Sequence, residues 1–137
     1  MWTCERVIGA DLDVSEVAAL YRASTLAERR PVEDTGRFAA MLAGANLIVT
    51  ARAGDGRLIG IARSLTDGVY ATYLSDLAVD AAWQGKGIGR DLIRATQDAA
   101  PQAKLILLAA PAAVDYYPHI GFERHNSAWT RSHTATT

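Results

Sequence analysis

The spacing of hydrophobic and polar positions divides the chain into strand-like and helix-like segments. Asp13 and Glu16 resemble a capping box, and the apolar residues that follow them recur at helical spacing. Further on, glycine-containing connections at residues 54–56 and 67–68 separate runs of β-forming residues, as in hairpins. These patterns predict strands over Thr3–Ile8, Asn46–Ala53, Arg57–Leu65, Val69–Val79, Lys104–Ala109 and Phe122–Arg131.

The same patterns predict helices that begin after Asp13 and near Gly87, and further helices over Thr35–Leu42 and Ala112–His119. Lys104–Ala109 is short and mostly apolar, so we expect that strand to be buried on both faces. The order β-α-α-β-β-β-α-β-α-β predicts an α/β or α+β fold, with helices flanking a mixed, mostly antiparallel sheet. Because domains commonly have about 100–150 residues, we expect residues 1–137 to form a single domain with a frayed tail at 132–137.

Charge and composition argue against several classes of partner. The chain has 14 Lys and Arg against 15 Asp and Glu. Its sequence lacks a basic stripe interleaved with aromatic residues, so we expect no nucleic-acid partner. The single cysteine, Cys4, excludes an internal disulfide and a cysteine-based metal cluster. His125 and His133 lack metal-like spacing with any carboxylate, so we expect no metal ion.

The sequence also predicts no membrane partner. The longest apolar stretch, Leu105–Val114, is about half a membrane span and contains Pro111. Glu5 and Arg6 stand where a signal peptide would need its apolar segment to begin. We therefore expect a cytoplasmic protein.

The segment Gln84-Gly85-Lys86-Gly87-Ile88-Gly89-Arg90 lies between a strand-like run and a helix-like run. First-turn amides of a helix lack intrahelical partners, and the helix dipole adds roughly half a positive charge there. Glycine lets the backbone approach a phosphate closely, and Lys86 and Arg90 add positive charge. The segment therefore predicts a diphosphate site. The alternative is a strand-to-helix turn without a ligand, because the segment matches neither G-x-x-x-x-G-K-[ST] nor G-x-G-x-x-G.

Two motifs resemble the GNAT superfamily of N-acetyltransferases. Gln84-x-x-Gly87-x-Gly89, which follows Leu77-Ala78-Val79, resembles the family's acetyl-CoA loop, [RQ]-x-x-G-x-[GA]. Tyr116–Phe122 resembles the family's aromatic-Tyr-x-x-x-Gly-Phe segment. The resemblance covers essentially the whole chain, and it implies a GNAT-like acyl-CoA N-acyltransferase fold with acetyl-CoA as co-substrate.

The resemblance also implies which residues bind the coenzyme. Main-chain groups of Leu77 and Val79 would meet the pantetheine arm and the acetyl carbonyl, at a point where the strands splay apart. The loop amides would bind the diphosphate. Many family members have an asparagine where this chain has Ala110, so that side-chain contact is absent here. The implied binding residues are Leu77, Ala78, Val79, Gln84, Gly85, Lys86, Gly87, Ile88, Gly89 and Arg90.

Tyr117 is the predicted proton donor to the coenzyme A thiolate. A free thiol has a pKa of about 8.5 and tyrosine about 10, so a well-placed phenol can protonate the leaving sulfur. Neighbours on a helix face about 100° apart, and we assign packing to Tyr116 and chemistry to Tyr117. Asp76 is the best-placed acid to serve as general base. The alternatives are that Asp76 satisfies nearby backbone donors and that solvent accepts the proton of the amine.

The resemblance therefore implies an acetyl-CoA-dependent N-acetyltransferase that acts on a primary amine by direct attack in a ternary complex. We expect a small-molecule amine as acceptor, with a protein amine as the alternative, and recognition of the acceptor by residues 22–37. A homodimer is common in the resembling family. Two other functions stay open: a non-catalytic module that binds coenzyme A or an acyl-CoA, and a nucleotide-binding fold.

Overall fold

A computed structural model describes residues 1–133 and contains one five-stranded sheet in the order β1-β2-β3-β4-β5. β1 to β4 pair antiparallel, and β5 pairs parallel with β4. The predicted mixed, mostly antiparallel sheet is therefore confirmed. The strands are β1 (Trp2–Val7), β2 (Leu47–Ala53), β3 (Leu58–Thr66), β4 (Ala71–Val79) and β5 (Lys104–Ile106).

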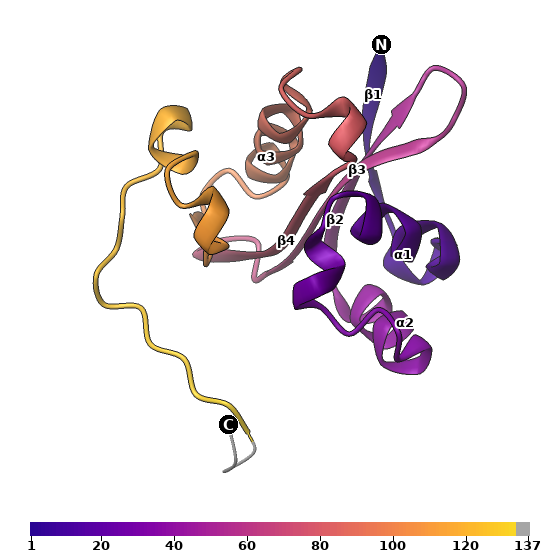
Figure 1. Cartoon of the computed structure of the whole chain (residues 1–137). Coiled ribbons are helices and arrows are strands. Elements are labelled where there is room, and N and C mark those ends of the chain that lie inside the picture. Colours follow the sequence, from indigo (N-terminus) through magenta and orange to yellow (C-terminus); the bar gives the residue numbers. More distant parts are fainter. Residues whose placement is uncertain (134–137) are drawn as a thin grey trace.

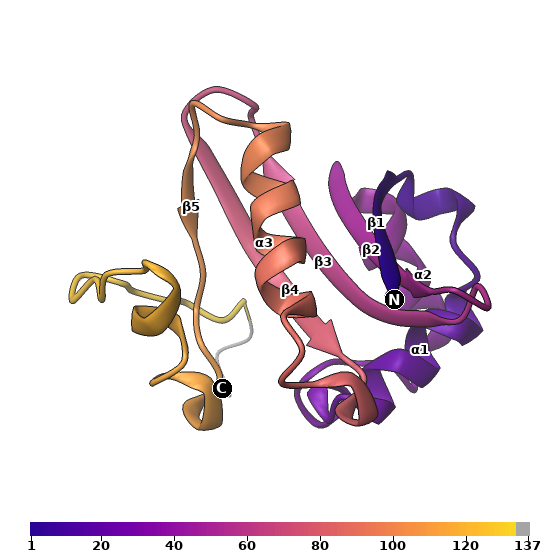
Figure 2. The ribbon, with the colours of Figure 1, turned by 90° about the horizontal axis from the view of Figure 1, so that it is seen from above.

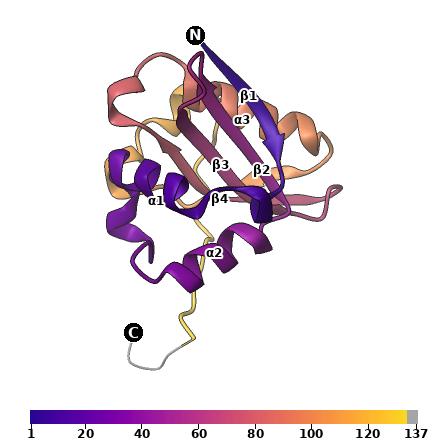
Figure 3. The same ribbon diagram turned by 90° about the vertical axis from the view of Figure 1, so that its right-hand side faces the viewer.

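Three α-helices cover the two faces of the sheet. α1 (Val14–Ala23) and α2 (Thr35–Gly44) lie on one face, and α3 (Ile88–Ala99) lies on the other (Figures 1 and 3). Each face has its own apolar core, because strand side chains alternate between the two faces. Tyr21 and Phe38 pack edge to face in the first core, with ring centroids 5.0 Å apart. Leu92 and Ile93 of α3 belong to the second core.

The helix starts follow from local hydrogen bonds. The Asp13 carboxylate accepts the backbone N–H groups of Ser15 and Glu16, at 2.9 and 3.3 Å, so the predicted N-cap is confirmed. Asp34 caps α2 in the same way. The Glu16 side chain, however, forms an ion pair with Arg52 of β2 and does not complete a capping box. This ion pair ties the first helix to the sheet.

Two predicted strand boundaries are wrong for identifiable reasons. β4 begins at Ala71, not at Val69, because the Asp67 carboxylate accepts the backbone N–H groups of Val69, Tyr70 and Ala71 and extends the turn. β5 ends at Ile106 and is not buried on both faces. Ile106 is 45% exposed, since α3 covers only one face of this edge strand.

The C-terminal region differs most from the prediction. Two 3-10 turns, Pro111–Ala113 and Tyr117–Ile120, replace the predicted helix over Ala112–His119, since Pro118 cannot donate a helical hydrogen bond. The predicted strand Phe122–Arg131 is wrong: beyond Phe122 the chain is irregular and exposed up to residue 133 (Figure 1). Trp129 is 91% exposed there, so this polar segment buries too little apolar surface to join the sheet.

Other predictions concern the tail and the membrane. Residues 134–137 of the predicted frayed tail lie outside the described residues. Over residues 1–133, the structure contains no helix with the length and apolar character that a membrane span needs.

Candidate active site

β4 and β5 separate soon after they meet. Within residues 1–133, their ladder ends at the pair Tyr73–Ile106, while β4 continues to Val79. Figure 2 shows the two strands close together at one end and far apart at the other, with α3 beside the opening. The second half of β4 therefore has an edge that no strand of the described chain covers. Apart from the Val79 carbonyl, which accepts a hydrogen bond from the Gln84 side chain, backbone groups on this edge can meet a ligand.

The glycine-rich loop leads from this edge into α3. Gly87 is the N-cap of α3 with a φ of 101°, and Gly85 has a φ of 79°. Residues other than glycine rarely adopt such positive φ values, which explains the residue type at each position. Gln84 donates its side-chain amide to the Val79 carbonyl at 3.0 Å and ties the loop to the end of β4. The loop thus presents the first amides of a long helix beside the open strand edge.

A groove of about 730 Å³ runs between the loop and the C-terminal 3-10 turns. Most of the predicted coenzyme-binding residues line it. Ala78 does not, because its side chain is buried in the core under α1. The lining residues are Leu77, Val79, Trp83, Gln84, Gly85, Lys86, Gly87, Ile88, Gly89, Arg90, Ala112, Ala113, Tyr116 and Tyr117.

Two adjacent tyrosines form part of the groove wall opposite the loop. Tyr117 is half-buried and packs edge to face on Phe122, with ring centroids 5.4 Å apart. Burial, and to a lesser extent Tyr116, raises the pKa of Tyr117, so the phenol keeps its proton at neutral pH. Tyr116 is 41% exposed, and the prediction that it is the packing member of the pair is wrong. Both rings reach the groove, but only Tyr117 also joins the core beneath α3.

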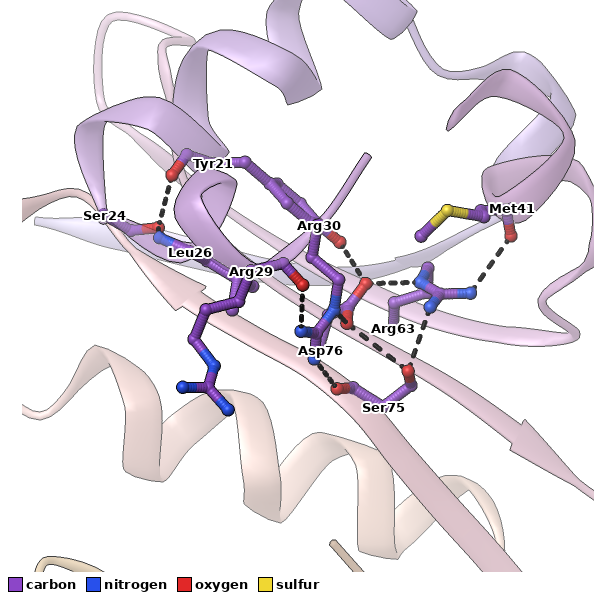
Figure 4. Close-up of polar contacts among 9 residues, drawn as sticks. All are labelled: Tyr21, Ser24, Leu26, Arg29, Arg30, Met41, Arg63, Ser75 and Asp76. Carbon is purple, nitrogen blue, oxygen red and sulfur yellow. Dashed lines mark hydrogen bonds and ion pairs between the residues drawn. The ribbon is translucent and has the colours of Figure 1, made fainter. Parts of the chain in front are cut away.

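Asp76 lies on the other face of the sheet in a buried polar cluster of Tyr21, Arg30, Arg63, Ser75 and Asp76 (Figure 4). Its Oδ2 accepts hydrogen bonds from the Tyr21 hydroxyl and the Arg63 Nε, both at 2.6 Å. Its Oδ1 accepts one from the Arg30 Nε at 2.5 Å. The residue is only 1% exposed. Both carboxylate oxygens are therefore engaged.

These contacts set the protonation state of the cluster. Burial by itself raises the pKa of Asp76, but hydrogen bonds and charge from Arg63, with help from Tyr21 and Arg30, outweigh burial and hold the pKa below its usual value. Burial and the charge of Asp76 raise the pKa of Tyr21. A carboxylate with a lowered pKa and two cationic partners binds a proton weakly. The cluster therefore favours a positioning role for Asp76 over that of a general base.

The cluster also stabilises an irregularity in the sheet. The register between β3 and β4 shifts at Arg63 and Ser64, which leaves Ser75 as an extra residue on β4. Arg30 donates to the Ser75 carbonyl at 2.8 Å, and Arg63 donates to the Ser75 hydroxyl at 2.9 Å. The sequence prediction missed both arginines and Tyr21. A carboxylate in the middle of an apolar strand was the available signal, because buried acids are almost always paired.

A family model described as an acetyltransferase (GNAT) domain matches residues 23–136. The chain belongs to the GNAT acetyltransferase family. A GNAT family acetyltransferase from Streptococcus pneumoniae has a similar structure, with a TM-score of 0.69 and 22% identity over 96% of this chain and 98% of that one. Aminoglycoside N-acetyltransferase AAC(6')-Iy in complex with CoA gives a TM-score of 0.72 at 16% identity, over 98% and 96% of the two chains. The sheet with helices on both faces is thus the GNAT fold.

Curated relatives of this GNAT chain include plant proteins. It is 34% identical to GCN5-related N-acetyltransferase 2, chloroplastic, from Arabidopsis thaliana. The 70 aligned residues cover 49% of this chain and 27% of the relative. It is 29% identical over 137 residues to histone acetyltransferase TAP1 from Glycine max, covering 88% of this chain and 58% of the relative. The chain therefore spans less than two thirds of the length of these relatives.

The groove of this GNAT domain has groups that fit coenzyme A. Amides at the start of α3, together with Lys86 and Arg90, suit a diphosphate. The free edge of β4 suits the amide groups of a pantetheine arm, which can pair with a strand as another backbone would. Tyr117 lies in the same groove, and its raised pKa keeps a proton on the hydroxyl at neutral pH. That the site binds no metal ion stays a prediction.

Proposed function

We propose that this GNAT domain is an acetyl-CoA-dependent N-acetyltransferase that transfers the acetyl group directly to a primary amine in a ternary complex. The observation that carries the proposal is one groove lined by the free edge of β4, the glycine-rich loop at the start of α3, and Tyr117. In this proposal the groove combines a diphosphate site, a strand edge and a proton donor. No single one of these features would be specific.

Each part of the groove has a defined task. Acetyl-CoA supplies the activated acetyl group as a thioester. Loop amides with Lys86 and Arg90 bind the diphosphate, and backbone N–H groups of β4 near Leu77 and Val79 polarise the acetyl carbonyl, as in an oxyanion hole. When the neutral amine attacks the carbonyl carbon, the carbon–sulfur bond breaks, and the Tyr117 hydroxyl donates its proton to the departing sulfur. The proton that the new amide nitrogen then releases restores the phenol. General-acid help of this kind is worth roughly 10²–10⁴-fold in rate.

Proton removal from the amine is assigned to solvent. An alkylammonium must lose a proton before it attacks, and Asp76 has both oxygens engaged by Arg63, Arg30 and Tyr21. We propose that Asp76 instead holds the bulged part of β4 in place, just before Leu77. A small-molecule amine is the proposed acceptor. AAC(6')-Iy, an aminoglycoside N-acetyltransferase with a similar fold, supports this class, and the plant histone acetyltransferase makes a protein amine the alternative.

An amine panel tests the proposal. The purified chain is incubated with acetyl-CoA and single amines, among them aminoglycosides, amino sugars, polyamines and a histone tail peptide, and release of free thiol is followed. Turnover with at least one small amine, together with calorimetric binding of acetyl-CoA, is the expected result. If acetyl-CoA binds but no amine is acetylated, the alternative function, a non-catalytic module that binds coenzyme A, is supported. Absence of binding to well-folded protein would reject the proposal.

A further inference from the structure

The groove has a polar atom on the wall that faces the glycine-rich loop. The Tyr116 hydroxyl lies beside the first turn of α3, at 3.4 Å from the position that a Cβ on Gly89 would occupy. Gly89 is the second residue of that helix. No hydrogen bond found within residues 1–133 uses this hydroxyl, and the ring is 41% exposed. A phenolic donor therefore stands free next to the helix start.

The surroundings determine what such a donor can bind. First-turn amides of α3 point toward the loop, and the helix dipole favours negative charge at this end. Lys86 and Arg90 line the same stretch of groove. A hydroxyl that faces amides and cations meets only hydrogen-bond donors, so an anion between them would be the common acceptor. Tyr116 reaches from the opposite side of the groove to the place where the proposed function puts the diphosphate.

The neighbouring tyrosine does not share this position. The rings of Tyr116 and Tyr117 pack edge to face, with centroids 5.3 Å apart and planes at 71° to each other. Tyr117 packs on Phe122 within the core beneath α3, whereas Tyr116 lies outside that core. The two hydroxyls therefore have different surroundings along the groove.

We propose that Tyr116 closes the diphosphate site from the wall opposite the loop, by donating its hydroxyl hydrogen bond to a diphosphate oxygen of coenzyme A. The proposal rests on the proposed function. It makes Tyr116 a binding residue and leaves the proton transfer to Tyr117. The diphosphate is then held by a helix start on one side and by a phenol on the other.

Binding measurements with matched ligands test this role. Tyr116→Phe removes one oxygen from an exposed ring, and Tyr70→Phe, in the turn before β4, is the control with the same chemistry. Affinities are measured by calorimetry for coenzyme A and for dephospho-coenzyme A, which keeps the diphosphate. Pantetheine, which lacks the diphosphate, is titrated by ligand-detected NMR. Thermal melts show that each variant is folded.

We expect Tyr116→Phe to weaken both diphosphate ligands about tenfold, as for loss of one hydrogen bond to a charged group, and to leave pantetheine binding unchanged. Tyr70→Phe leaves all three affinities at the wild-type value. An unchanged affinity of Tyr116→Phe for coenzyme A would overturn the proposal. An equal loss of affinity for all three ligands would also overturn it, because Tyr116 would then act on the pantetheine arm or on packing. Failure of the wild-type chain to bind coenzyme A would instead reject the proposed function.

Discussion

The Tyr21 hydroxyl donates a 2.6 Å hydrogen bond to the Asp76 carboxylate across 55 positions of the chain. This bond joins α1 to β4 inside the protein, where Tyr21 is fully buried and Asp76 nearly so. Arg30, in the connection between the first two helices, reaches the same carboxylate. Asp76 therefore fixes the helices that cover one face of the sheet to the strand that borders the groove.

Asp76→Ala is expected to lower the free energy of unfolding by about 3–5 kcal/mol, because it leaves the Arg63 guanidinium buried without its carboxylate. Urea denaturation followed by circular dichroism measures this loss. Asp98→Ala, on the exposed side of α3, is the matched control and should stay within about 0.5 kcal/mol of wild type. A loss as small as that of the control would show that the cluster contributes little to stability.

The dependence of stability on pH gives a second test of Asp76. Its pKa is lowered from the ordinary value of 3.8, so its contribution is fully present above that value and is lost as the pH falls through the lower pKa of the folded state. Asp76→Asn cannot titrate. The stability difference between wild type and Asp76→Asn is therefore expected to be constant near neutral pH and to shrink below about pH 4. Urea titrations at several pH values measure it, and a difference that grows on acidification would contradict the assignment.

Tyr117→Phe is expected to lower kcat by roughly 10²–10⁴-fold with the best amine of the panel, since the leaving thiolate loses its proton donor. The raised pKa of Tyr117 predicts that the wild-type enzyme does not lose this donor anywhere in the neutral range. Steady-state thiol release and calorimetry with coenzyme A measure both steps. If kcat is unchanged while coenzyme A still binds, the phenol is not the donor.

Gly87→Ala is expected to weaken coenzyme A binding about tenfold, because a side chain at a φ of 101° costs roughly 1–2 kcal/mol and displaces the amides at the start of α3. Gly36→Ala is the control, since a Cβ at this position in α2 meets nothing closer than 4.0 Å, and it is expected to leave binding unchanged. Calorimetry compares the two variants. Wild-type affinity in Gly87→Ala would show that the loop amides do not hold the ligand.

Local signals in the sequence predicted the central hairpins and the starts of α1 and α3. The hairpins, the N-cap of α1 and the glycines before α3 all depend on residues close together in the chain, and each was recognisable from residue type alone. The two predicted hairpins account for the neighbouring strands β2, β3 and β4. The closing strand failed, because Phe122–Arg131 has β-forming residues but no continuous apolar face to bury.

Long-range contacts were harder to predict. Nothing in the residues next to Asp76 indicates that Arg30 and Arg63 approach it from two different elements. The directions of Tyr116 and Tyr117 depended on a helix that Pro118 does not allow to form, so the assumption of helical spacing placed the wrong ring in the core. Contacts between residues of different elements therefore require the folded structure, whereas contacts within one turn or loop can be predicted from the sequence.

The early separation of β5 from β4 also affects how the protein will behave at high concentration. A strand edge with unsatisfied amides and carbonyls can recruit a strand from another molecule and start aggregation. A pantetheine arm seated along β4 would cover this edge and block such recruitment. Preparations supplied with coenzyme are therefore expected to store and concentrate better than ligand-free ones, quite apart from any gain in melting temperature.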